Sequence, residues 1–243
     1  MKEIEIVCHK GANEYAPENS YAAAQRCIDW GIDYIEIDVR TSQDGVFYLL
    51  HDPTVDRTTN GQGAIAELTA AEIDQLDAGS WFHPQFKGER VPRLDHFLRW
   101  IKGKAKLFLD VKAADPQTLI TLIDEIGMAE ACFFWSGSEQ WMQEFRTLAP
   151  HLALKVNVES AEDVVRAHEL FQANIVEVGL EQMSHSLQKA CQSRGIKVMI
   201  YHQQKDVAAF RAVLDWKVEL INLNHGDLFL EVLRSYGDRE IGR

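Results

Sequence analysis

Short apolar runs rich in β-branched and aromatic residues alternate along the chain with longer segments of helical period. This alternation is typical of βα units and a parallel sheet. The runs expected to be strands lie near Ile4–Cys8, Tyr34–Val39, Lys106–Val111, Cys132–Trp135, Leu152–Val156, Ile175–Val178, Lys197–Ile200 and Glu219–Leu223.

The segments between these runs have the spacing of amphipathic helices. Several begin at Ser, Asp or Pro and end at Gly, as at Gly31, Gly127 and Gly195. The expected helices are Asn19–Trp30, Pro116–Ile126, Ser138–Leu148, Ala161–Phe171, Ser186–Ser193 and Asp206–Leu214. Eight strands with single intervening helices in 243 residues predict an α/β fold, a (β/α)₈ TIM barrel, with a doubly wound open sheet as the weaker alternative.

One stretch breaks the alternation between Arg40 and about Leu94. It contains a hairpin signal at Asp44-Gly45, then a glycine-rich turn, then a short helix that begins after Thr69. Its apolar residues have ordinary density, so we expect it to pack against the barrel mouth. The sequence therefore predicts one domain over 1–243 with a small insertion after the second strand, at about 53–94.

Polar residues at the carboxyl ends of the strands are the candidates for chemistry, because active sites of such barrels form there. On the second strand, a period of two places Glu36 and Asp38 on one face. The third strand places Asp110 and Lys112 on a shared face in the same way. Neighbouring carboxylates repel one another, and hard oxygen ligands suit Mg²⁺ or Ca²⁺, so Glu36, Asp38 and Asp110 are candidate ligands of a divalent metal ion.

Two histidines follow strand-like runs close to these carboxylates. His9 could be a core histidine and His51 part of a turn, but beside a metal site acid–base chemistry is the better interpretation, because imidazole titrates near neutral pH. Asn19 is equally consistent with a helix cap and with a substrate contact.

The net charge and the cysteines limit which molecules the protein can bind and in which compartment it works. With 25 Lys and Arg against 37 Asp and Glu, the net charge of −12 argues against nucleic acid and an anionic membrane surface as partners. The four cysteines are scattered singly, and no apolar stretch has the length of a signal peptide or a membrane span. We expect a protein of the reducing cytoplasm that acts on a small molecule.

Motifs of other enzyme classes are missing. The sequence has no GxSxG nucleophile elbow, no GxGxxG after the first strand and no GxxxxGK[ST] phosphate loop.

The motifs that are present resemble the glycerophosphodiester phosphodiesterase family in order and spacing. They are His9-Lys10-Gly11, Pro17-Glu18-Asn19-Ser20, Glu36-Ile37-Asp38-Val39, Asp44-Gly45, His51-Asp52-Pro53-Thr54, Arg57-Thr58-Thr59-Asn60-Gly61 and Val91-Pro92-Arg93-Leu94. The strong part of the resemblance covers roughly the first 112 residues.

The resemblance implies a phospholipase C-like barrel that uses a divalent cation to hydrolyse glycerophosphodiesters to glycerol 3-phosphate and an alcohol. By position it implies His9 and His51 as the acid–base pair. It implies Glu36, Asp38 and Asp110 as metal ligands, and Lys10 and Lys112 as contacts to the phosphate. Which histidine is the acid, and whether water or a substrate hydroxyl attacks first, stays open.

The chain departs from the family pattern around the expected pocket. Lys10 stands where the family usually has Arg, and Asp110 where it usually has Glu. Tyr201-His202-Gln203 and Leu223-Asn224-His225 replace Trp-Thr and Thr-Asp. We therefore add Tyr201 and Asn224 to the expected substrate contacts, because their hydrogen-bonding capacity suits a polar, sugar-bearing phosphodiester.

Two alternatives belong to other classes of function. A non-catalytic phosphodiester-binding barrel would have no chemical reason to keep the full set of histidines and carboxylates. A barrel aldolase or isomerase could use Lys155 as its base or Schiff-base lysine, but the paired carboxylates and both histidines would then have no role.

Overall fold

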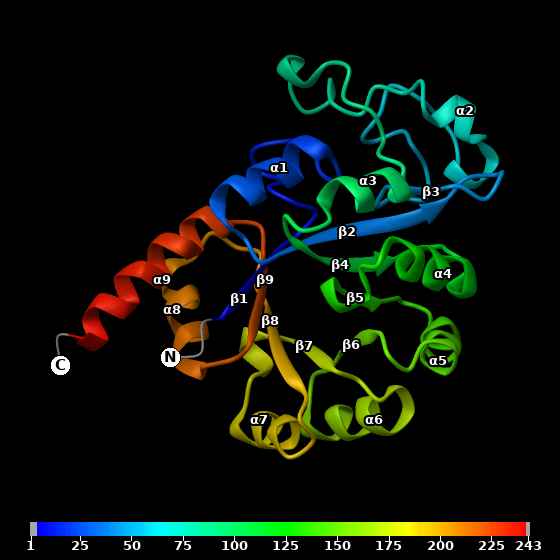
Figure 1. Ribbon diagram of the computed structural model, residues 1–243. Coiled ribbons are helices and arrows are strands. Elements are labelled where there is room, and N and C mark those ends of the chain that lie inside the picture. The colour runs from blue at the N-terminus through cyan, green and yellow to red at the C-terminus, as the bar shows by residue number, and fades with distance from the viewer. Residues whose placement is uncertain (1–3, 242–243) are drawn as a thin grey trace.

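Eight parallel strands form a closed ring in the computed structural model, which describes residues 4–241 (Figure 1). The ring closes because β1 pairs with both β2 and β9, so the predicted barrel is confirmed and the open sheet is excluded. The ring consists of β1 (Glu5–Cys8), β2 (Tyr34–Thr41), β4 (Lys106–Val111), β5 (Cys132–Trp135), β6 (Ala153–Asn157), β7 (Ile175–Gly179), β8 (Lys197–Tyr201) and β9 (Leu220–Leu223).

Helices surround the ring (Figure 1). They are α1 (Tyr21–Trp30), α3 (Leu94–Ile101), α4 (Pro116–Ile126), α5 (Glu139–Leu148), α6 (Ala161–Phe171), α7 (His185–Gln192), α8 (Val207–Trp216) and α9 (Gly226–Ile241). The predicted helices are all present with ends shifted by at most two residues. Their ends have physical causes: Asp115 caps α4, Pro116 is its first residue, and Gly127 ends it with φ 71°.

Helices α3 and α9 are not among the elements that the sequence pattern predicts. Leu94, Phe97, Leu98 and Ile101 of α3 are buried, which is the i, i+3, i+4, i+7 spacing of an amphipathic helix. The sequence pattern predicts an irregular insertion up to about Leu94 and no helix directly after it.

Alternating side chains of the strands enter two separate apolar clusters. Outward-facing residues such as Ile35 and Ile37 pack in the large core between the ring and the helices. Inward-facing residues, including Tyr34, Phe108 and Phe133, form a small plug inside the barrel. The next inward positions toward the carboxyl ends of β2 and β4 are the polar residues Glu36 and Asp110. The apolar plug therefore lies directly below these polar side chains, inside the barrel.

The stretch between β2 and α3 begins with the hairpin that the Asp44-Gly45 signal predicts. Strand β3 (Phe47–Leu49) pairs antiparallel with β2, and Gly45 has φ 84° in the turn between them. The short helix α2 (Ala70–Ile73) follows Thr69, whose side chain and Glu72 form a capping box. Seven buried residues give the stretch between β2 and α3 its own apolar cluster: Tyr48, Leu50, Val55, Ile65, Ala70, Ile73 and Val91.

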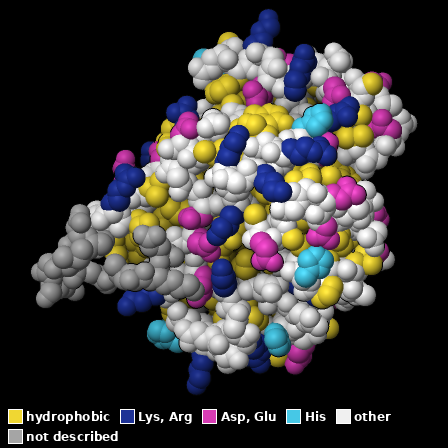
Figure 2. Space-filling model, in the orientation of Figure 1, with side chains coloured by type: hydrophobic (Ala, Val, Ile, Leu, Met, Phe, Trp, Pro, Cys, Tyr) yellow, Lys and Arg dark blue, Asp and Glu magenta, His cyan; other side chains and the backbone are white. Residues whose placement is uncertain are grey.

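Charged side chains of both signs are interspersed over the face of the molecule shown in Figure 2. All four cysteines are free and buried, as expected of reduced core residues. Over the described part of the chain, no helix is both long and apolar enough to cross a membrane.

Candidate active site

A cavity of about 690 Å³ opens at the carboxyl ends of the strands. Most of the residues predicted from the sequence line it: His9, Glu36, His51, Asp110, Lys112 and Tyr201. Asp38 is fully buried beside them, whereas Lys10 and Asn224 do not line the cavity and contact residues that do.

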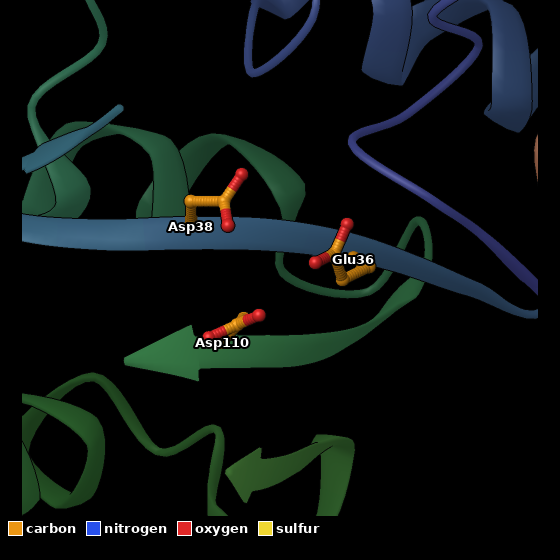
Figure 3. Close-up of side chains that lie close together, drawn as sticks. All are labelled: Glu36, Asp38 and Asp110. Carbon is orange, nitrogen blue, oxygen red and sulfur yellow. The ribbon is translucent and has the colours of Figure 1, made fainter. Parts of the chain in front are cut away.

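Three carboxylates meet at one side of this cavity. Glu36 and Asp38 lie on β2 and Asp110 lies on the neighbouring β4, directly opposite Asp38 in the strand register (Figure 3). One oxygen atom of each lies within 4.8 Å of the other two. Asp110 Oδ1 is buried and accepts no hydrogen bond from the described residues, and buried Asp38 Oδ1 has the Lys112 ammonium 3.2 Å away as its charged neighbour. Buried carboxylate oxygens with so few donors, in a group this compact, fit a divalent metal ion.

The electrostatics of the cluster point the same way. Burial, followed by the charges of Asp38 and Asp110, raises the pKa of Glu36 well above its ordinary value. Burial and Asp38 likewise raise the pKa of Asp110. Lys112 Nζ lies 2.6 Å from Asp110 Oδ2 and 3.2 Å from Asp38 Oδ1. One ammonium group does not balance three carboxylates, so the cluster favours further positive charge.

Asn19 holds Asp38 in place. Its Nδ2 donates to Asp38 Oδ2 at 2.7 Å and its Oδ1 accepts from the Asp38 backbone N–H at 2.9 Å. The helix-cap interpretation of Asn19 is wrong, because Ser20 is the residue whose side chain accepts from the first turn of α1. Asn19 has φ 56°, a left-handed conformation that asparagine tolerates better than most residues.

His9 lies at the end of β1 with its ring mostly buried. Its Nδ1 is 2.9 Å from Asn224 Oδ1, which also accepts from Asn13 Nδ2 at 2.8 Å. With Asn224 Oδ1 as the acceptor shared by both contacts, the hydrogen bond requires a neutral His9 to carry its proton on Nδ1 and leaves Nε2 as an acceptor. Burial lowers the pKa of His9, and the hydrogen bond to Asn224 partly opposes that effect.

His51, two residues after the end of β3, is positioned by a chain of ion pairs. Its Nδ1 lies 2.8 Å from Asp52 Oδ1. Asp52 accepts from Arg57, and this bond keeps the pKa of Asp52 well below its usual range. Arg57 in turn contacts Glu18, whose Oε1 lies 3.5 Å from Lys10 Nζ. The two histidines therefore differ in environment, one beside an amide and one beside an ionised carboxylate.

The loop after β1 takes an unusual backbone path. Lys10 has φ 57° and Gly11 has φ 77°, and a Cβ on Gly11 would lie 2.8 Å from Ala23 Cβ of α1. In this path the backbone N–H of Lys10 donates to Glu36 Oε2. A hydrogen bond thus connects Glu36 of the carboxylate cluster to the backbone of the residue that follows His9.

Further polar side chains of the cavity were not predicted as site residues. Lys155, Glu177 and Asn222 are buried and line it. Each stands alone in its stretch of sequence, and only the strand register brings them together. His202, by contrast, does not line the cavity: its ring packs edge-on against Phe210 of α8.

Comparisons with known proteins agree with this geometry. The model of the "Glycerophosphoryl diester phosphodiesterase family" matches residues 9–228. A glycerophosphodiester phosphodiesterase of Caldanaerobacter subterraneus is 35% identical over 161 residues, 63% of this chain. The matched region spans 66% of the length of the Caldanaerobacter protein. It spans 64% of the length of a second curated relative, from Bacillus subtilis.

Solved structures extend the similarity to nearly the whole chain. The crystal structure of a glycerophosphodiester phosphodiesterase from Agrobacterium tumefaciens is 39% identical with a TM-score of 0.90, covering 93% of this chain and 99% of that one. An Oleispira antarctica phosphodiesterase, solved with the product sn-glycerol-3-phosphate, has a TM-score of 0.83 at 23% identity, covering 95% and 96% of the two chains. At that identity the second similarity concerns the fold.

Proposed function

The chain belongs to the glycerophosphoryl diester phosphodiesterase family, and from that premise we propose that it hydrolyses a glycerophosphodiester to glycerol 3-phosphate and an alcohol. The observation that carries the proposal is the position of two histidines and a compact carboxylate cluster around one cavity. Diester hydrolysis needs charge neutralised on the phosphoryl oxygens, a nucleophile deprotonated and a leaving alkoxide protonated. Relatives named for this activity support the same assignment.

Glu36, Asp38 and Asp110 are the residues that would hold a divalent metal ion, Mg²⁺ or Ca²⁺. When bound, such an ion would neutralise charge on the phosphoryl oxygens and lower the pKa of a coordinated hydroxyl group. Lys112, beside Asp110 at the cavity wall, would add a fixed positive charge for the phosphate. Lys10, whose ammonium is paired with Glu18, is a proposed phosphate contact that requires its side chain to turn toward the cavity.

His9 and His51 are the proposed acid–base pair. His9, neutral because burial lowers its pKa, offers Nε2 as a proton acceptor. His51 Nδ1 lies 2.8 Å from Oδ1 of the ionised Asp52, and His51 is the proposed proton donor. This assignment makes His9 the base and His51 the acid. Tyr201, which lines the cavity, is a proposed contact to the substrate. Asn224 does not line the cavity and is proposed to act on the substrate indirectly, by orienting His9.

The four free, buried cysteines support a reducing compartment, so we also propose that the protein works in the cytoplasm on a small diester.

Product analysis tests the function. Wild-type protein with Mg²⁺ or Ca²⁺ should release glycerol 3-phosphate from glycerophosphocholine, detected by a coupled dehydrogenase. His51→Ala should lower kcat by about 10²–10⁴-fold, the usual contribution of a general acid or base. Exposed His168→Ala on α6 serves as the matched control and should keep the wild-type rate. A non-catalytic binding barrel would instead bind the diester without releasing product.

A further inference from the structure

Lys155, Glu177 and Asn222 lie across the cavity from the carboxylate cluster and have no part in the hydrolysis described above. They belong to β6, β7 and β9, on the far half of the ring from β2 and β4. Their exposed fractions are 1%, 9% and 2%, yet all three border the cavity. We call them the distal triad.

The distal triad is held together by directed bonds. Lys155 Nζ donates to Glu177 Oε2 at 2.5 Å and to Asn157 Oδ1 at 2.6 Å. Asn222 Nδ2 donates to Glu177 Oε1 at 3.0 Å. A carboxylate only accepts hydrogen bonds, so Asn222 must turn its nitrogen toward Glu177 and its oxygen away from it.

That orientation leaves one acceptor without a donor. Asn222 Oδ1 is buried and makes no hydrogen bond within the described residues, although both other members of the triad are paired. A buried acceptor without a donor is costly, and such groups are rare in folded proteins. A hydroxyl group of a ligand in the cavity would supply the missing donor.

The surrounding wall fits a hydroxylated carbon skeleton. The Trp135 ring lines the cavity beside the triad, with Lys155 Nζ 4.5 Å from its centroid, and Tyr201 stands at the rim with 43% of its surface exposed. Aromatic faces accept the C–H groups of a polyol while amide and phenol groups take its hydroxyls. An alkyl chain would leave Asn222 Oδ1 unpaired, and a quaternary ammonium would lie against the Lys155 cation.

We propose that Asn222, oriented by Glu177 and Lys155, determines specificity by accepting a hydrogen bond from a hydroxyl group on a polyol arm of the diester. This inference rests on the proposed function, because it takes the phosphate to lie at the carboxylate cluster. Glycerol and a sugar alcohol both carry hydroxyl groups that could bind Asn222. The experiment below distinguishes which of these two arms of the diester does so.

Equilibrium binding of three monoesters tests the proposal without turnover. Calorimetric titrations in Mg²⁺ would compare glycerol 3-phosphate, inositol 1-phosphate and propyl phosphate, which has no free hydroxyl on its carbon chain. Wild-type protein should bind at least one hydroxylated ester about tenfold or more tightly than propyl phosphate, because a site built for a hydroxyl rejects an analogue that lacks it. Preference for glycerol 3-phosphate identifies the glycerol arm, and preference for inositol 1-phosphate identifies a sugar alcohol.

Asn222→Leu should abolish this preference by weakening only the hydroxylated esters. Asn222→Ala, which adds no bulk, serves if the leucine variant does not fold. Ile221→Val, on the same strand but facing the helices, is the matched control and should keep the preference. Equal binding of all three esters by wild type, or a preference that survives in both Asn222 variants, would overturn the inference. Failure of wild-type protein to cleave any diester would overturn the proposed function instead, since the binding comparison does not depend on cleavage.

Discussion

At the scale of single residues, the two histidines of the site differ in the atom that each faces through Nδ1. His9 faces the amide oxygen of Asn224, and His51 faces the ionised carboxylate of Asp52. An amide oxygen fixes the tautomer of a histidine but stabilises its positive charge less than a carboxylate does, because the amide carries no net charge. This difference is the physical basis for treating His9 as the base.

Asn224→Asp should therefore raise the pKa of His9. The carboxylate would still accept from Asn13 and would add a negative charge at 2.9 Å from His9 Nδ1. If His9 is the base, the acidic limb of the kcat/KM profile moves to higher pH, and if it is the acid, the alkaline limb does so. A profile in which neither limb moves upward would contradict the contact between Asn224 and a reacting histidine.

Strand-end carboxylates and histidines could be predicted because a period of two and the end of an apolar run are visible in the sequence. The function of Asn19 could not, because Asn19 and Ser20 are adjacent and either can cap a helix. The distal triad was also missed, since Lys155 and Glu177 are 22 residues apart and meet only through the register of β6 and β7.

At the scale of elements, β2 and β4 carry the carboxylate cluster in a register that places Asp38 opposite Asp110. The strands were predicted to within two residues, and the hairpin β3 followed from Asp44-Gly45. The pattern predicts these two strands as ring neighbours, but the register that sets Asp38 opposite Asp110 is visible only in the structure. The carboxylate cluster thus depends on the register of two neighbouring strands. Its three carboxylates repel one another when no cation is bound.

Asp110→Asn should have two effects: it should reduce the repulsion among the carboxylates, and it should weaken metal binding. Without divalent cations, a relief of about 1 kcal/mol would raise Tm by roughly 2–4 °C in a chain of this size. The metal concentration needed for half-maximal activity should rise by about tenfold or more. Calorimetry and metal titration measure the two effects, and exposed Asp29→Asn on α1 is the control. A variant with a lower Tm and unchanged metal dependence would contradict the assignment of Asp110.

The loop between β1 and α1 is the element that sets the position of His9. Gly11→Ala would place a Cβ 2.8 Å from Ala23 Cβ at a φ of 77°. We expect a loss of about 1–3 kcal/mol in the free energy of unfolding, measured by urea denaturation, with a fall in kcat. Gly103→Ala, at the same φ but with open space around it, should cost stability without a comparable fall in kcat.

At the scale of the whole molecule, the net charge of −12 coexists with a site for an anionic substrate. Surface charges are screened within about 8–10 Å at physiological salt, so the groups at the cavity decide whether a small anion binds. Lys112 and a cation among the three carboxylates would provide that local positive charge.

Metal binding should stabilise the fold more at pH 8 than at pH 5. The pKa values of Glu36 and Asp110 are raised above 4.5 and 3.8, so the folded protein binds protons more tightly than the unfolded chain. The stability of the metal-free protein is therefore full below those values and falls as pH rises through the folded pKa values. A divalent ion offsets this loss at high pH and competes with protons at low pH. Thermal unfolding with and without Ca²⁺ at both pH values measures the effect, and an equal gain in Tm would contradict it.

We infer that the protein hydrolyses a glycerophosphodiester at the barrel mouth with a divalent metal ion. Release of glycerol 3-phosphate from glycerophosphocholine by wild-type protein, measured before EDTA, after EDTA and after re-addition of Mg²⁺ or Ca²⁺, tests this inference. We expect that EDTA abolishes the release and that one of these ions restores it. Release that persists unchanged in EDTA, or no release with either ion, would contradict it.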